Sequence, residues 1–506
     1  MEPNTKGRRT LRLGWPELAV LCIPAVVVLG NLTLPLQEDA LFWWVPHAAE
    51  IAESGPRWAP SGDLPEACKP GDALPGQWRN GLPDYGHPPL WFHYLALFMA
   101  LIPNALIAVR VACLAIALGI GWGVLRISRC VVPERLAPIL AAMVLIVPAV
   151  GVQWVRPDTD LGLMLGVVWT LVFVLESKPL AAACVAALAV WVKEPGVLLA
   201  VPMFAAARRD PRFLGLSLAP VGALLFWGWT HAAQVGWAFA ESERLPDSIS
   251  GWLSDLLTVG RLIAFDGGRW VFVALAGLAV VLVRWRAQRL VWPKFSVELG
   301  AFLLAWWLAL GTINFLGGRE VADNYTHLRY FLPAIIALVL FVGAFLLENL
   351  RTSLGGSDQR VGLVLLGIVA VAFLPGSRSL GWGPESSWYG RDLARVTEKV
   401  HAHRANDLGG SGKVWVGSYL FVALTRPYAG GRWIDDRLKP FSGDTRPEDL
   451  AVSDGVLHAS YGEPLSRLNE RVLEPVWREQ VGHAWVEYAV VRPGRAAPPP
   501  KAGGAP

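Results

Sequence analysis

The chain has 506 residues, of which 54% are hydrophobic and 17% are charged, and its formal net charge is +4. Soluble chains contain about 25% charged residues, so this composition argues against a soluble globular protein. The small net charge, without a basic stripe interleaved with aromatic residues, argues against a nucleic-acid partner. Tryptophan is abundant, with 25 copies, as is typical of proteins that anchor aromatic rings at the bilayer surface. We therefore expect an integral membrane protein that contacts the lipid bilayer and binds no nucleic acid.

The first apolar run, residues 15–35, follows a basic N-terminus and ends just before two adjacent carboxylates, Glu38 and Asp39. Aromatic residues 42–44 come next. A cleaved signal peptide is the alternative for this run. The run is long and no small-x-small cleavage motif follows it, so the sequence favours a retained membrane span.

Ten further apolar runs have about the length that crosses a bilayer. The stretch 178–207 is interrupted by Lys193-Glu194-Pro195, and proline disfavours helix in the residue before it, so two spans are predicted to meet there. The fold class predicted is an all-α polytopic membrane protein with about 11–13 transmembrane helices. These runs are 105–126, 135–151, 157–176, 178–193, 195–207, 212–236, 269–287, 297–316, 328–348 and 360–376.

Lysine and arginine in the short connections predict the orientation, because basic loops stay in the cytoplasm. The N-terminus carries Lys6, Arg8, Arg9 and Arg12 and is predicted to be cytoplasmic. We expect a multi-pass protein of the bacterial inner (plasma) membrane. Alternation then places these segments outside: 36–104, 152–156, 193–195, 237–268, 317–327 and 377–506.

The segment PPLWFHYLALFMALIP, residues 88–103, breaks this alternation. It is apolar but only about 16 residues long, and a full span here would reverse every later basic loop. We interpret it as a juxtamembrane or re-entrant helix within the first outer loop, 36–104. A short tilted span is the alternative.

The C-terminal part differs from the rest of the chain in composition. Residues 1–376 form the predicted transmembrane module, and the more polar residues 377–492 contain strand-like stretches at 413–424 and 483–491. We expect a small α/β domain outside the membrane there. The end, 493–506, is rich in proline, glycine and alanine and predicts a disordered tail.

Several reactive or ionisable residues are expected to be structural. Four of the five cysteines lie in or beside apolar runs, where cysteine behaves as a small hydrophobe. No Cys-x-x-Cys or Cys/His spacing supports a disulfide framework or a zinc site. Three residues on apolar stretches are expected to satisfy core or interfacial contacts: His93, His231 and Arg110.

Polar residues at the predicted outer ends of the apolar runs are the strongest functional signal. Ionisable groups near the bilayer are costly, so their recurrence on one side indicates a site. Each has a structural alternative: a solvated span end for the paired acids, a turn for the histidine, an ion pair for Arg-Asp or Lys-Glu, and a snorkelling anchor for the late arginine. The residues are Glu38, Asp39, His87, Arg156, Asp158, Asp160, Lys193, Glu194, Arg329 and Tyr330.

These residues lie in five motifs that occur in a fixed order: EDALFWW, DYGHPPLWF, WVRPDTDLGLMLG, WVKEPGVLLAVP and RYFLP. Over roughly residues 15–350 the chain resembles the C-type glycosyltransferase superfamily, which includes protein O-mannosyltransferases and aminoarabinose transferases. These polytopic enzymes use polyprenyl-phosphate sugars. Each motif alone is weakly specific, whereas the five in order are fairly specific.

The resemblance implies a carboxylate role for three residues. Glu38 and Asp39 match the family's acidic pair, one of which is the usual catalytic base, and Asp158 matches a second acid. The order here is Glu-Asp, whereas many members read Asp-Glu, which leaves open which acid is the base.

The remaining matches imply binding of the donor phosphate. His87 matches the histidine before the proline pair, Lys193 the lysine of an outer turn, and Arg329 and Tyr330 the late Arg-Tyr. The adjacent Arg156 could add a further cation. Around the lysine the chain departs from the family, because Val192 replaces the usual threonine and Glu194 is unusual.

Elementary chemistry fits these roles. A lipid phosphate is a good leaving group whose charge needs cations at low dielectric, and a hydroxyl nucleophile needs a carboxylate to take its proton. The resemblance implies a single displacement with inversion on the extracytoplasmic face. The acceptor could be a glycan, a lipid or a protein. No cofactor is indicated with certainty, a divalent cation shared by Asp158 is possible, and metal dependence is open because related families differ. Two alternatives remain: a secondary transporter or lipid flippase, and a membrane anchor that displays the C-terminal domain.

Overall fold

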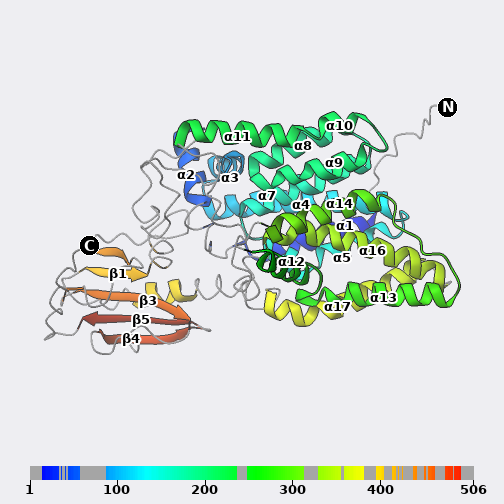
Figure 1. The fold of residues 1–506 in the computed structure, drawn as a ribbon. Coiled ribbons are helices and arrows are strands. Elements are labelled where there is room, and N and C mark those ends of the chain that lie inside the picture. Colours follow the sequence, from blue (N-terminus) through cyan, green and yellow to red (C-terminus); the bar gives the residue numbers. More distant parts are fainter. Residues whose placement is uncertain are drawn as a thin grey trace.

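The structure is a computed structural model that describes residues 14–32, 36, 40, 44–56, 87–235, 248–312, 329–354, 358–380, 395–403, 413–417, 420, 424, 437–441, 450–451, 454–461, 473–481 and 484–491. A layered bundle of helices makes up most of it, and a five-stranded sheet follows at the C-terminal end (Figure 1). The main helices are α1 (Trp15–Leu29), α2 (Val45–Ser54), α3 (Leu90–Leu101), α4 (Ala105–Val131), α5 (Ala137–Leu145), α6 (Pro148–Gln153), α7 (Thr159–Leu175), α8 (Pro179–Val192), the 3-10 helix η4 (Glu194–Leu199), α9 (Ala200–Ala206), α10 (Arg212–Leu216), α11 (Ala219–Val235), α12 (Ile249–Ala264), the 3-10 helix η5 (Asp266–Gly268), α13 (Trp270–Trp285), α14 (Ser296–Thr312), α16 (Leu332–Leu354) and α17 (Asp358–Leu380).

Three of the described helical stretches are long and apolar enough to cross a membrane by length and composition: Ala105–Val131, Arg212–Ala233 and Arg329–Ser353. Shorter apolar helices pack along them, including α7 and α8. Most of the predicted apolar runs therefore coincide with helices, although several are shorter than predicted. Proline explains some of the breaks, since Pro148 separates α5 from α6 within the predicted span 135–151.

Small residues let the central helices approach closely. A side chain at Gly166 on α7 would lie 2.5 Å from Cβ of Ala189 on α8, and one at Gly123 on α4 would lie 2.4 Å from Val168. Such contacts are typical of helix packing in membranes, where lipid tails give no hydrophobic drive and close backbone approach supplies van der Waals attraction. The α4–α7–α8 layer is thus closely packed, and it supports the loops at its ends.

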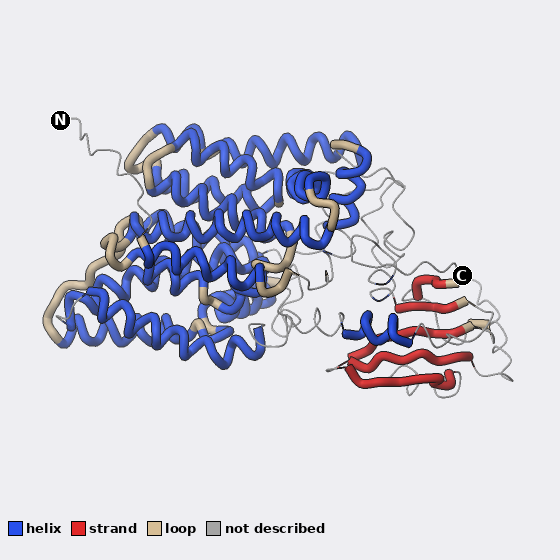
Figure 2. The backbone as a smooth tube through the Cα atoms, turned by 180° about the vertical axis from the view of Figure 1, so that it is seen from behind, coloured by secondary structure: helices blue, strands red, loops and turns tan. Residues whose placement is uncertain are grey.

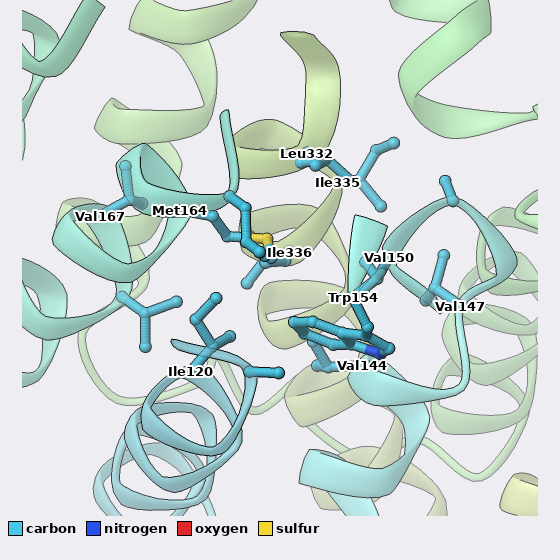
Figure 3. Packing of buried hydrophobic residues seen from close by; sticks show 14 of the residues in the cluster. Ile120, Val144, Val147, Val150, Trp154, Met164, Val167, Leu332, Ile335 and Ile336 are labelled. Atoms are coloured by element: carbon cyan, nitrogen blue, oxygen red, sulfur yellow. The ribbon is translucent and has the colours of Figure 1, made fainter. Parts of the chain in front are cut away.

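The main apolar core lies where α4, α5, α6, α7 and α16 meet (Figure 3). Ile120, Val144, Met164 and Ile335 are fully or almost fully buried there, next to the ring of Trp154. This core holds the starts of α7 and α16 beside each other.

Two helices concern the predicted outer loops. α3 has 12 residues, and at 1.5 Å per residue it rises about 18 Å, short of the roughly 30 Å hydrocarbon core. Other helices at predicted spans, such as α8 with 14 residues, are also shorter than this, so the juxtamembrane or re-entrant placement of 88–103 stays a prediction. The predicted outer loop 237–268 contains α12, which the sequence analysis did not identify. Its apolar residues recur at helical spacing and are interrupted by Ser254, Asp255 and Arg261, so no long apolar run marks it.

The C-terminal sheet has strand order β2-β1-β3-β5-β4. Strand β1 pairs with β3 in parallel, and β3 pairs with β5 in antiparallel orientation. A helix over 395–403 lies near the sheet (Figure 2). The predicted strand at 483–491 is confirmed, and within the predicted stretch 413–424 the described strand is Val414–Gly417. The strands are β1 (Val414–Gly417), β2 (Leu438–Phe441), β3 (Gly455–Tyr461), β4 (Leu473–Val481) and β5 (Ala484–Val491).

Candidate functional site

The loop between α6 and α7 carries the first two charged residues of the site, Arg156 and Asp158. Two buried donors hold its backbone: Trp91 Nε1 donates to the carbonyl of Pro157 at 2.8 Å, and an Arg110 Nη1 donates to the carbonyl of Val155. Trp91 is on α3 and Arg110 is on α4. Because the two carbonyls flank Arg156 and Asp158, these helices fix the position of the loop. Arg110 was expected to make core contacts, and its contact with the Val155 carbonyl helps to hold the loop that carries the site residues.

Asp158 is fully buried and precedes α7 as its N-cap residue. Its Oδ2 accepts from Arg156 Nε at 2.9 Å and from Arg329 Nη1 at 3.2 Å. Its Oδ1 has no hydrogen-bond partner among the residues that the structure describes. A buried carboxylate oxygen usually has a hydrogen-bond donor, so Asp158 Oδ1 is available to a donor from outside the described residues.

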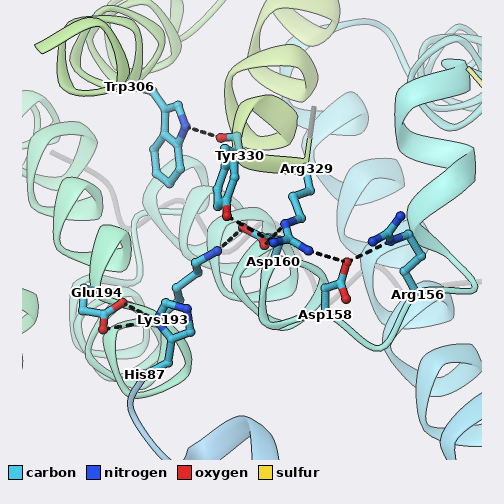
Figure 4. Close-up of polar contacts among 9 residues, drawn as sticks. All are labelled: His87, Arg156, Asp158, Asp160, Lys193, Glu194, Trp306, Arg329 and Tyr330. Atoms are coloured by element: carbon cyan, nitrogen blue, oxygen red, sulfur yellow. Dashed lines mark hydrogen bonds and ion pairs between the residues drawn. The ribbon is translucent and has the colours of Figure 1, made fainter. Parts of the chain in front are cut away.

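Asp160, in the first turn of α7, joins two cations. Lys193 Nζ lies 2.7 Å from its Oδ1, and Arg329 Nε lies 3.4 Å from its Oδ2 (Figure 4). Arg329 thereby contacts both carboxylates of α7. It is 7% exposed, which is inconsistent with a snorkelling anchor at the surface.

Tyr330 completes this cluster from the segment before α16. Its hydroxyl accepts from Arg329 Nη2 at 3.1 Å, and Lys193 Nζ lies 4.5 Å from its ring centre. Trp306 Nε1 on α14 donates to the Tyr330 carbonyl at 3.0 Å. The Tyr330 ring therefore makes a cation–π contact with Lys193. The Tyr330 backbone is held by the buried indole of Trp306.

Lys193 is the C-cap residue of α8, where the partial negative charge of the helix end favours a cation. The chain turns sharply after it, and a side chain on Gly196 would lie 2.6 Å from the backbone nitrogen of Val190. The structural alternative, an ion pair between Lys193 and Glu194, is not formed. Lys193 points to Asp160, and Glu194 points to His87.

His87 lies at the edge of this site. Its Nδ1 lies 3.0 Å from Glu194 Oε2, and its ring is 5.5 Å from that of Trp44. The paired side chains are 22% and 28% exposed, so this edge of the site is the more open part.

α2 packs on the other side of this aromatic group. The ring of His47 meets Phe92 edge-on at 5.7 Å. Burial lowers the pKa of His47 from 6.5 to about 3, because the charged form loses its hydration. His47 is therefore neutral at physiological pH and is part of the packing between α2 and α3.

The structure thus brings together six predicted residues: His87, Arg156, Asp158, Lys193, Arg329 and Tyr330. The predicted acids Glu38 and Asp39 lie outside the described residues. Among the residues that are described, no three His, Cys, Asp or Glu side chains converge on a common point, and the predicted optional divalent cation stays a prediction.

Two residues of the site received no role from the sequence. Asp160 was part of the predicted polar cluster, and its spacing of two from Asp158 in the first turn of a helix is the sequence signal that indicates a role. Glu194 departs from the family pattern, and its histidine partner is 107 residues away, so local sequence could not pair them.

Buried cations are the main feature of this cluster. Arg156, Lys193 and Arg329 face the carboxylates of Asp158 and Asp160, all on side chains no more than 9% exposed. The third carboxylate of the site, Glu194, faces His87 at the more open edge. Cations buried in a low-dielectric setting interact strongly with anions, so the cluster is suited to bind a phosphate or carboxylate group.

No protein-family model and no curated protein matches the chain. Among solved structures, the chain is similar to ArnT from Cupriavidus metallidurans bound to undecaprenyl phosphate, with a TM-score of 0.55 and 15% identity, over 93% of this chain and 97% of that one. It shares the fold of ArnT.

The likeness holds for ArnT in its apo state as well, with a TM-score of 0.54. The Archaeoglobus fulgidus oligosaccharyltransferase, in complex with Zn and sulfate, is more distant, with a TM-score of 0.45 and 12% identity over 84% of this chain and 62% of that one. The ArnT likeness confirms the fold that the sequence motifs imply.

Proposed function

We propose that this protein is an integral membrane glycosyltransferase that moves a sugar from a polyprenyl-phosphate carrier to an acceptor hydroxyl. The observation that supports it most is the buried cluster of Lys193, Arg156 and Arg329, held by two carboxylates in a chain with the ArnT fold. ArnT is a protein whose structure holds undecaprenyl phosphate. A lipid phosphate needs cationic hydrogen-bond donors in a low-dielectric setting, and this cluster supplies three of them.

In the proposed reaction the acceptor oxygen attacks the anomeric carbon. A carbon–oxygen bond forms there, and the bond from that carbon to the phosphate oxygen breaks, so the electron pair leaves with polyprenyl phosphate. The proton of the acceptor passes to a carboxylate base, Glu38 or Asp39. One displacement inverts the configuration of the sugar. We place this step on the extracytoplasmic face, where the basic loops predict the site to lie.

The cations act on the leaving group. Lysine has three donors, and Asp160 takes one from Lys193, so among the described residues this ammonium keeps donors for a phosphate oxygen. Arg329 contacts both carboxylates and is thereby fixed in one orientation. Preorganised donors of this kind stabilise developing negative charge without reorganising during the reaction. Asp158, whose Oδ1 accepts no hydrogen bond from the residues that the structure describes, could orient a hydroxyl of the sugar or the acceptor.

Binding and transfer can be tested separately. The full chain, reconstituted in liposomes, should bind undecaprenyl phosphate, and Lys193→Met should weaken binding about 10–100-fold, the value of one charge-assisted hydrogen bond. Lys178→Met is a matched control, because Lys178 is a lysine paired to Glu176 at the far end of α8. Equal binding by both variants would overturn the assignment of the phosphate site.

Transfer is then followed from a panel of polyprenyl-phosphate sugars into envelope acceptors. Glu38→Gln and Asp39→Asn should leave carrier binding intact, and one of them should abolish transfer. Carrier binding without transfer from any donor, or movement of the carrier across the bilayer, would favour the lipid flippase or transporter alternative.

A further inference from the structure

The segment between α13 and α14 has an unusual composition for this chain. Residues 284–294 read RWRAQRLVWPK, with four cations, two tryptophans and no acid. All four cations are exposed, and so are Trp285, at 80%, and Trp292, at 62%. We call residues 284–294 the basic loop. It lies at the end of the helices away from the polar site, since α16 begins beside that site and its last turns contact this loop.

The basic loop is a built structure rather than a loose connection. Asn349 on α16 is fully buried and uses its amide on the backbone of Val291, accepting from its N–H at 2.9 Å and donating to its carbonyl at 2.8 Å. Ser353 on the same helix bonds Gln288 at 3.1 Å. Because buried polar side chains of α16 form hydrogen bonds to this loop, its backbone has a defined conformation, and the exposed cations have defined positions.

The beginning of the loop is closed in the same way. Gln288 N donates to the carbonyl of Val283, and Ala287 N donates to that of Arg284, the bond pattern of a Schellman cap. Ala287 adopts the left-handed conformation, with φ of 50°, which is uncommon for a residue other than glycine.

Several other cations at this end of the helices are matched by carboxylates, although Arg135 and Arg360 are exposed and unpaired among the described residues. Arg129 pairs with Glu17, Arg212 with Asp210 and Arg351 with Glu348. Among the residues that the structure describes, none of the four cations of the basic loop pairs with an acid. The loop therefore presents a concentrated positive charge that the described part of the protein does not neutralise.

The surroundings point to the kind of partner. On α13, Leu278, Val281 and Trp285 recur on one face and are exposed, so an outward apolar stripe ends where the arginines begin. Tryptophan and arginine at the end of an apolar stripe are typical of the bilayer interface. We propose that the basic loop binds the headgroups of anionic phospholipids, on the side of the membrane opposite the polar site.

The test uses the full chain in detergent, titrated with phosphatidylglycerol or phosphatidylcholine, with bound lipid counted by native mass spectrometry. Wild-type protein should bind phosphatidylglycerol at least tenfold more tightly. The variant Arg286→Gln/Arg289→Gln should lose roughly 25-fold for that lipid, at roughly fivefold per cation. Arg286→Lys/Arg289→Lys keeps the charge and should keep most of the preference.

Arg212→Gln is the matched control, since Arg212 is exposed at the same end but paired with Asp210, and it should change lipid binding less than twofold. Equal binding of the two lipids by wild-type protein would overturn the proposal, as would a Gln double variant that behaves like wild type. Displacement of phosphatidylglycerol by millimolar inorganic phosphate would assign the loop to free anions and would also overturn it.

Discussion

The two ends of α7 and α8 both carry ion pairs, but they place them in different environments. At the start of α7, Asp158 and Asp160 are buried with buried partners. About 25 Å away along the same helix, Glu176 pairs with Arg126 and Lys178, and the lysine side chain is 53% exposed. Exposed pairs contribute little to stability, whereas buried pairs are costly to form and costly to break.

A third acid makes the comparison sharper. Glu298 on α14 is fully buried like Asp158, but its partners Arg208 and Arg209 are 49% and 27% exposed. Those arginines can return to water when the acid is removed, and Lys193 cannot. Burial of the cation, rather than of the acid, therefore distinguishes the site from the other charged clusters.

The largest effect is expected from Asp160→Asn. It leaves Lys193 buried with an unpaired charge, so we expect a loss of about 3–5 kcal/mol in the free energy of unfolding, together with loss of carrier binding. Glu298→Gln should cost less, about 1–2 kcal/mol, because its partners can rehydrate. Thermal unfolding of the two variants in the same detergent measures both. Equal losses would break the distinction between the two ends.

A smaller loss is expected from Gly162→Ala on α7. The added methyl group would lie 2.6 Å from the ring of Trp91, whose indole holds the Pro157 carbonyl. Overpacking of this kind costs about 1–3 kcal/mol, and the displaced loop should also lower activity. Gly222→Ala on α11, where no atom lies within 4 Å, is the control and should stabilise by up to about 1 kcal/mol. A neutral Gly162→Ala would show that Trp91 does not position the loop.

Much of this arrangement follows from local sequence, and some of it cannot. Apolar runs predicted most helices because burial in lipid requires them, and six polar positions were predicted to share a site that the structure brings together. The partners of these residues depend on contacts across 33 to 171 positions, which no local pattern contains. α12 was missed because its apolar residues are periodic rather than continuous, and Asp160 was given no role because the cations that flank it come from α8 and from the segment before α16.

His47 on α2, beside the site, makes the stability of this end of the protein depend on pH. His47 has a pKa of about 3 in the folded protein against an ordinary 6.5. The unfolded chain therefore binds the proton first, so stability is full above pH 6.5 and declines as the pH falls toward 3. At pH 5 the loss is about 2 kcal/mol. Hydrogen exchange in α2 should rise between pH 7 and pH 5 after correction for the intrinsic rate, and His47→Phe should remove that rise. A rise of the same size in the variant would assign it to another group.

The smallest predicted effect belongs to the end away from the site, where two helices close on residues other than glycine. Ser177 after α7 and Ala287 after α13 have φ of 55° and 50°, a conformation that costs an L-residue about 1–2 kcal/mol. Glycine removes this strain but loses more entropy on folding, so Ser177→Gly and Ala287→Gly should each stabilise by about 0.5–1 kcal/mol. Ala207→Gly, at a helix end with φ of −58°, has no strain to relieve and should destabilise by a similar amount. Opposite signs for the two kinds of position, measured as shifts in the unfolding temperature, would show that this end tolerates backbone strain that no ligand requires. Destabilisation in all three would mean that side-chain contacts of Ser177 and Ala287 outweigh their strain.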